Sequence, residues 1–219
     1  MTNNAFILAG SYSIAIAAVI GLIRLHKVYA AYQPFIFITM ASFLNEVVSH
    51  LLIMHRKSNA IAINVFGLFD ALLWLWQFRR WNIHQKRRML FEFAAIVLVI
   101  LWLIENIALK KLFVFGAIYP ITFSLLIVLF AAIEAARQIA KDKSSLIRTP
   151  KFMICCGVVL FYTYRMLIEC FYLPGISGSN IFLGNLFTIV SFVNFIVNIF
   201  YALVVLCIPE KQKFSLPYY

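Results

Sequence analysis

A carboxylate and an imidazole lie close together within an apolar run at residues 34–54. Glu46 and His50 are four residues apart, so on a helix their side chains share one face. The run is long enough to cross a bilayer. Ionisable side chains at membrane depth are costly, and they usually point into a helix bundle or a wet cavity. The pair therefore predicts polar partners on other helices.

Three other apolar runs carry polar residues that suit this role. Asp70 is followed one turn later by Trp74, and Arg165 is followed one turn later by Glu169. Asn194 belongs to a polar stripe at helical spacing in the last run. Counted along their runs, these side chains reach depths similar to those of Glu46 and His50. We expect all seven residues to form one polar cluster, in the half of the membrane away from the cytoplasm.

The cluster contains more acid than base. Glu46, Asp70 and Glu169 face one arginine, so two acids must be protonated, share His50 or meet a ligand. This surplus favours a binding site. A structural network that joins the helices through an Arg165 ion pair is the alternative, because polar contacts between helices are common in membrane proteins.

The composition predicts the elements that hold these residues. Of 219 residues, 64% are hydrophobic and 12% charged, whereas a soluble domain is near half apolar and a quarter charged. Runs of about 20 apolar residues indicate transmembrane helices. We expect an all-α membrane protein in which residues 1–219 form one polytopic domain, a bundle of seven helices. The expected spans are 5–25, 34–54, 60–78, 89–109, 112–136, 152–173 and 181–208.

Two details of the fifth span follow from this division. Only Lys110 and Lys111 separate it from the fourth span, so the connecting hairpin must be very tight. Pro120 would lie inside the fifth helix, where proline kinks the backbone and frees a carbonyl.

The basic residues predict the orientation, because cytoplasmic loops of membrane proteins are rich in Lys and Arg. With the N-terminus outside, fourteen Lys and Arg residues fall on the cytoplasmic side and four on the outer side. We therefore expect the N-terminus outside and the C-terminus in the cytoplasm of a multi-pass plasma (inner) membrane protein. The net charge of +11 is then spread between the spans, which does not indicate nucleic-acid binding.

Motifs for catalysis and metal binding are largely missing. The sequence has no HExxH and no GxSxG, and its four cysteines show no metal-binding spacing. Glu46, His50 and Asp70 are too weak a pattern to predict a metal site. We expect no metal and no cofactor, and a non-enzymatic role more than an enzymatic one.

Two known layouts are similar in part. Seven helices with an external N-terminus resemble the microbial rhodopsins, but residues 181–208 lack the lysine that binds retinal. The span count also resembles transporters built as three helices, a linker helix and three helices. Asn64 and Asn185 open the third and seventh spans in parallel, as such a repeat requires.

These observations rank the functions. The leading hypothesis is a receptor-like or sensor module for protons or for a small polar or anionic ligand. Its other expected partners are the lipid bilayer and a cytoplasmic or membrane protein that docks on the basic loops. A small-solute transporter is the first alternative, and an intramembrane enzyme that modifies lipids is the second.

The orientation can be tested by labelling single cysteines in intact cells. Cysteine at position 84 or 145 should react only after the membrane is permeabilised, because both positions lie in the expected cytoplasmic loops. Cysteine at position 57 or 177 should react from outside. The reverse pattern would show that the polar cluster faces the cytoplasm.

Overall fold

The computed structural model is all-helical in the residues that it describes, which are 10–82, 88–141, 149–171 and 180–210. Its elements follow the apolar runs closely. They are α2 (Ile14–Arg24), η1 (Ala30–Tyr32), α3 (Gln33–Met54), α4 (Ala60–Trp81), α5 (Arg88–Leu103), η2 (Ile104–Ala108), α6 (Ile118–Lys141), α7 (Pro150–Phe171) and α8 (Asn180–Cys207).

Six of these helices are long and apolar enough to cross a membrane. The seventh helix, residues 10–24, is apolar but shorter, and residues 5–9 of the first expected span lie outside the described part. Large apolar side chains such as Ile23, Met54 and Phe93 point outward from the bundle, as lipid-facing residues do. The chain is therefore a multi-pass membrane protein in contact with the lipid bilayer, whereas the count of seven spans stays a prediction.

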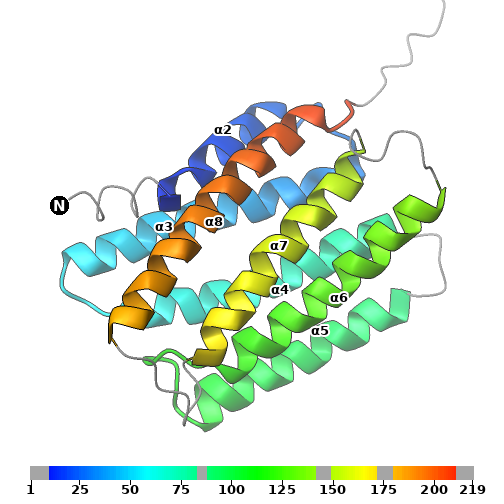
Figure 1. Cartoon of the computed structure of the whole chain (residues 1–219). Helices are drawn as coiled ribbons and strands as arrows, with labels where there is room; N and C mark the ends of the chain where they lie inside the picture. Colours follow the sequence, from blue (N-terminus) through cyan, green and yellow to red (C-terminus); the bar gives the residue numbers. More distant parts are fainter. Residues whose placement is uncertain (1–9, 83–87, 142–148, 172–179, 211–219) are drawn as a thin grey trace, which may run out of the picture.

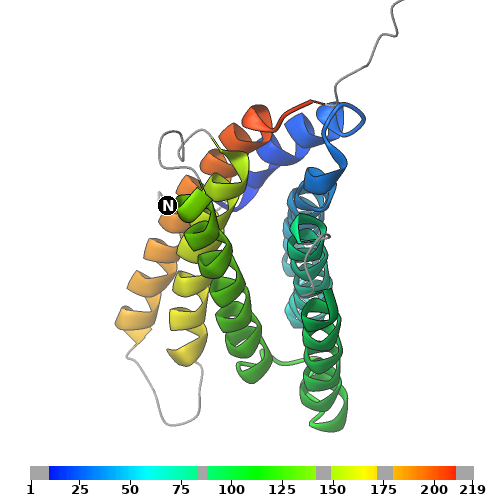
Figure 2. The ribbon, with the colours of Figure 1, turned by 90° about the vertical axis from the view of Figure 1, so that its right-hand side faces the viewer.

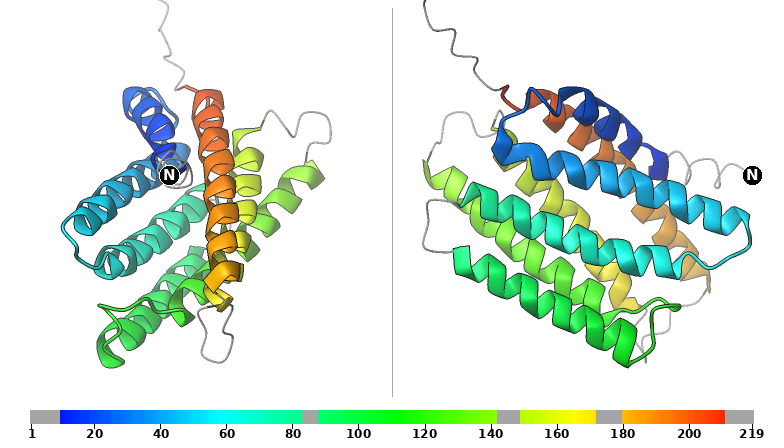
Figure 3. Two further views of the ribbon diagram at one scale, coloured as in Figure 1. Left: turned by 60° about the vertical axis from the view of Figure 1, so that its left-hand side comes forward. Right: turned by 180° about the vertical axis from the view of Figure 1, so that it is seen from behind.

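The helices form a ring in chain order (Figure 1). Figure 2 shows α3, α4 and α5 on one side and α6, α7 and α8 on the other. Helix α2 packs against both α3 and α8, so it joins the two sets (Figure 3). The ring leaves room between the two sets for residues of α3, α4, α7 and α8 to meet.

Basic residues gather at one end of the ring, which we call the basic end. Consecutive helices run in opposite directions, so the last turns of α2, α4 and α6 meet the first turn of α7 there. These segments carry Arg24, Arg79, Arg80, Arg137 and Lys151. The placement agrees with the charge pattern on which the predicted orientation depends, but the direction in the membrane stays a prediction.

The start of the fifth span was predicted wrongly. Helix α6 begins at Ile118 rather than near residue 112, so residues 109–117 connect it to the preceding helix in place of a tight hairpin. Pro120 is then the third residue of α6. Proline is tolerated in a first turn, because the carbonyl four residues earlier is not yet part of the helix. The expected kink and free carbonyl therefore do not arise.

A buried carboxylate explains why α6 begins where it does. Glu105, in the π-helical turn η2, accepts hydrogen bonds from the backbone N–H of Ile118 at 3.1 Å and of Tyr119 at 2.5 Å. These are two of the amides that a helix start leaves unpaired. A side chain at Gly116 would come within 2.6 Å of the Glu105 carboxylate, so glycine there permits the approach. Glu105 therefore caps α6 from a different helix.

Two other helix ends are satisfied in the same way. The Gln77 side chain accepts a hydrogen bond from the Phe35 N–H at 2.8 Å and donates one to the Ala31 carbonyl at 2.7 Å, at the start of α3. Arg24 donates to the carbonyls of Val205, at 2.7 Å, and of Ile208, at 3.0 Å, at the end of α8. Each contact joins residues that are at least 42 positions apart in the chain.

We expect the Glu105→Ala variant to unfold more easily, by about 2 kcal/mol, because it leaves buried amides of α6 unpaired. Thermal and denaturant unfolding in detergent would measure the loss. Glu92→Ala is the control: Glu92 forms a 3.0 Å ion pair with Arg79, but both side chains are well exposed, so the cost should stay below about 1 kcal/mol. Equal losses in the two variants would contradict the capping role.

Candidate functional site

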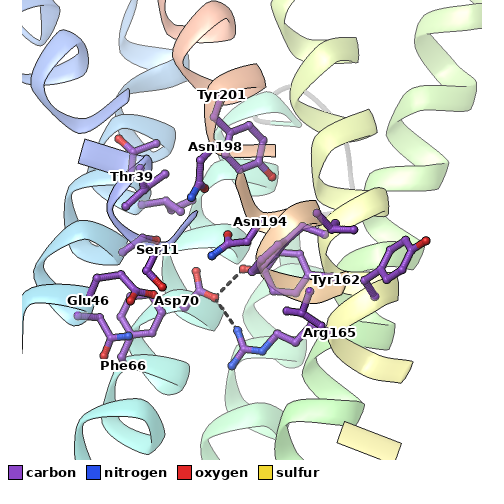
Figure 4. A pocket seen from close by; sticks show the side chains of 18 of the residues that line it. Ser11, Thr39, Glu46, Phe66, Asp70, Tyr162, Arg165, Asn194, Asn198 and Tyr201 are labelled. Atoms are coloured by element: carbon purple, nitrogen blue, oxygen red, sulfur yellow. Dashed lines mark hydrogen bonds and ion pairs between the residues drawn. The ribbon is translucent and has the colours of Figure 1, made fainter. Parts of the chain in front are cut away.

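A cavity of about 380 Å³ lies between the two halves of the ring. Its walls come from α3, α4, α7, α8 and the helix that begins at Gly10 (Figure 4). On α7 the lining runs from Phe161 to Glu169, which is the half of that helix farther from the basic end. The polar lining residues are Ser11, Thr39, Ser42, Asn45, Glu46, Asp70, Tyr162, Tyr164, Arg165, Glu169, Asn194, Asn198 and Tyr201.

Most residues of the predicted cluster line this cavity. Glu46, Asp70, Trp74, Arg165, Glu169 and Asn194 are all among its walls. His50 is not among the lining residues; its ring lies edge-on to Tyr12, with the ring centres 5.8 Å apart. His50 is one turn beyond Glu46 toward the far end of α3, where Tyr12 covers it. Although Glu46 and His50 share one face of α3, only Glu46 lines the cavity.

Asp70 is the centre of a buried polar network that joins α4 to α7. Its Oδ2 atom accepts a hydrogen bond from the Tyr162 hydroxyl at 2.5 Å and lies 3.6 Å from an Arg165 guanidinium nitrogen. The Tyr162 oxygen in turn accepts a hydrogen bond from Trp74 Nε1 at 2.7 Å. Asp70, Trp74 and Tyr162 are each at most 2% exposed. The ion pair of Arg165 within the described residues is thus with Asp70 on another helix.

Sequence reasoning missed Tyr162. A signal was present, because Tyr162 precedes Arg165 by three residues and so shares its helix face. The guanidinium carbon of Arg165 lies 6.0 Å from the centre of the Tyr162 ring, at the outer limit of a cation–π contact. Tyrosine is common in apolar helices, however, and its hydroxyl became informative only when a buried acid was found beside it.

The Asp70–Arg165 pair leaves the rest of the cavity acidic. Glu46 projects from α3, with Ser11 beside it in Figure 4, and Glu169 is one turn beyond Arg165 on α7. Together with Asp70 these are three carboxyl groups against one guanidinium. At membrane depth a carboxyl group either holds its proton or meets a cation or a hydrogen-bond donor. The cavity is therefore chemically suited to a ligand that supplies positive charge or donors.

A layer of packed aromatic rings closes the cavity toward the basic end. Phe35 contacts Tyr201 and Trp74, with ring centres 5.2 and 6.1 Å apart, and Trp74 contacts Phe78 at 6.1 Å. Tyr162 packs against Phe123 at 5.3 Å. Phe35 and Phe78 lie in the parts of α3 and α4 nearer the basic end, and both are buried. We refer to Phe35, Trp74, Phe78, Tyr162 and Tyr201 as the aromatic floor.

The polar stripe of α8 serves two purposes. Asn198 donates hydrogen bonds to Ser13 Oγ at 3.0 Å and to the Gly10 carbonyl at 3.3 Å, so it also holds the first helix against α8. A side chain at Gly10 would come within 2.9 Å of the Ser191 carbonyl, which shows how closely the two backbones approach. Asn194, one turn earlier, lines the cavity. Asn185 lies among residues whose side chains are outside the described part.

Comparison with known protein families, with curated proteins and with solved structures found no match. Among the described residues, no three His, Cys, Asp or Glu side chains are grouped so that they could hold a metal ion. A function for this cavity therefore has to be argued from its shape and chemistry.

We expect Arg165→Leu to lower the free energy of unfolding by about 3 kcal/mol, because it leaves the buried Asp70 without its cation. The double variant Arg165→Leu/Asp70→Asn should lose at least about 1 kcal/mol less unfolding free energy than the sum of the losses in the two single variants. Unfolding in detergent would measure this coupling. Arg165→Leu/Glu92→Gln is the control and should be additive, because Glu92 lies near the basic end and outside the cavity. Additivity in the Asp70 double would contradict the pairing.

Proposed function

We propose that the cavity binds a small ligand with a cationic or hydrogen-bond-donating group, and that the protein is a receptor-like or sensor module of the plasma membrane. The observation that carries this proposal is the acid surplus. Glu46 and Glu169 line a cavity whose arginine is already paired with Asp70. An amine at this position would form charge-assisted hydrogen bonds, which are stronger than neutral ones.

The pairing of Arg165 also bears on the sign of the ligand charge. The charge of Arg165 is already offset by Asp70, whose Oδ2 atom lies 3.6 Å from a guanidinium nitrogen. An anionic ligand would have to share this guanidinium with Asp70 and would add negative charge beside Glu46 and Glu169. A cationic ligand would reduce this repulsion. The proposal therefore favours a cation over the anion that Arg165 suggested in the sequence.

The aromatic floor supports a receptor-like role over transport. A receptor pocket needs one mouth, whereas a transporter must expose its site to each side in turn. The rings of Phe35, Trp74 and Tyr201 are packed and almost fully buried on the side toward the basic end. With the predicted orientation, the cavity would open away from the cytoplasm and the basic loops would be available to a cytoplasmic partner.

A small-solute transporter is the second candidate. The observation that favours it is the position of the cavity between the two sets of helices, with α3 and α4 on one side and α7 and α8 on the other. Rocking of one set against the other is a common way to alternate access. The floor would then act as a gate.

Binding of butylamine to the purified protein in nanodiscs, followed by calorimetry, would test the proposal. We expect Glu46→Gln to weaken binding by about tenfold or more, because it removes a charge-assisted hydrogen bond. Glu92→Gln, which alters an acid near the basic end and outside the cavity, should bind like the parent. No binding, or equal loss in both variants, would overturn the proposal.

Uptake by protein-containing liposomes separates the two candidates. A receptor-like module should bind butylamine without accelerating the entry of radiolabelled choline or tetramethylammonium, which cross lipid slowly on their own. Uptake that disappears in Glu46→Gln would place the transporter first.

A further inference from the structure

A second hollow, which we call the lateral groove, lies on the outside of the ring between α3 and α4. It encloses about 740 Å³, and its walls are almost entirely apolar. Leu44 and Val48 line it from α3, and Val65 and Phe69 line it from α4. Leu44 and Phe69 are 60% and 58% exposed, so the groove faces the surrounding lipid.

The lateral groove and the polar cavity share a wall. Asn45 of α3 and Phe66 of α4 line both of them. Asn45 directly precedes Glu46 in the chain, and Figure 4 places Phe66 next to Glu46 on the cavity side. Two side chains from neighbouring helices therefore stand between the lipid phase and the acid on which the proposed function depends.

We propose that Asn45 and Phe66 form a lateral portal and that the ligand is a single-chain amphiphilic amine. Its ammonium group would occupy the cavity at Glu46, and its alkyl chain would pass between Asn45 and Phe66 into the lateral groove. This inference rests on the proposed function, because it specifies the class of ligand for the same cavity. It assigns an occupant to a groove that shares two lining residues with the cavity.

The dimensions of the groove fit an alkyl chain. Its lining on α3 extends from the portal residue Asn45 about 10 Å to Leu52 and about 6 Å to Ala41, or about 16 Å in all, at a rise of about 1.5 Å per residue. That is about half of the roughly 30 Å hydrocarbon core, or one leaflet. Lys57 and Ser58 line its far end, at the level expected for lipid head groups. A chain in the groove would remain at hydrocarbon depth.

The chemistry of the two compartments also matches the two ends of such a molecule. A chain already dissolved in the bilayer gains little from apolar contact as such, so the groove would contribute shape and close packing. The head group, by contrast, gains charge-assisted hydrogen bonds that lipid cannot supply. The affinity should therefore have two contributions, one from the head group at Glu46 and one from the alkyl chain in the lateral groove. A substitution in the groove should weaken only the second.

The test compares dodecylamine with butylamine in phosphatidylcholine nanodiscs, by calorimetry, for variants that fill the groove. Val48→Trp and Val65→Trp each place a bulky ring in it, from opposite walls. We expect either variant to weaken dodecylamine binding by about tenfold and to leave butylamine binding unchanged, which also shows that the variant is folded. Leu125→Trp is the matched control, since Leu125 of α6 is 47% exposed and Val48 is 45% exposed.

A dodecylamine with a photoreactive diazirine at its last carbon should label α3 and α4 along the groove. Suppose that butylamine binds, but that both groove variants bind dodecylamine like the parent or that the label is found only on other helices. Either result would overturn the lateral portal and leave the proposed function standing. Failure of both amines to bind would overturn the proposed function and this inference with it.

Discussion

A backbone amide or carbonyl that is buried at a helix end has no water to bond with, and the protein must supply its partner. Three side chains do this across the ring: Glu105 for the start of α6, Gln77 for the start of α3 and Arg24 for the end of α8. Each comes from a different helix than the one it caps. The requirement to satisfy helix ends therefore also ties each capped helix to a neighbouring helix and limits how far the two can slide along each other.

The network around Asp70 determines which charged groups of the cavity already have a partner. Trp74, Tyr162 and Arg165 all bond to Asp70 directly or through one another, so α4 and α7 are held together at the centre of the bundle. Because the arginine is engaged there, Glu46 and Glu169 would decide which ligand the proposed site attracts. The same Trp74 and Tyr162 belong to the aromatic floor. Trp74 and Tyr162 thus take part both in the polar network and in the aromatic packing that closes one side of the cavity.

The position of Glu46 gives the proposed ligand site two neighbours. Toward the centre are the paired charges of α4 and α7, and toward the lipid is the wall shared with the lateral groove. A head group held by Glu46 would touch α3 and the helix that carries Ser11, while Glu169 would approach it from α7. Binding would then bear on the contact between the two sets of helices, which is where a receptor-like module or a transporter must change shape.

The sequence alone predicted most of the helices, because apolar run length matches membrane thickness, and the faces that their polar groups share, because helical spacing fixes them. Residues 34–54 and 60–78 were predicted within a few positions, and six of the seven cluster residues line one cavity. Tertiary structure decided the rest. The start of α6 depends on Glu105 across a nine-residue connection, and Arg165 pairs with Asp70 although Glu169 is nearer in the chain. Spacing within a helix cannot give the rotation and height of its neighbour, and these decide which polar groups meet.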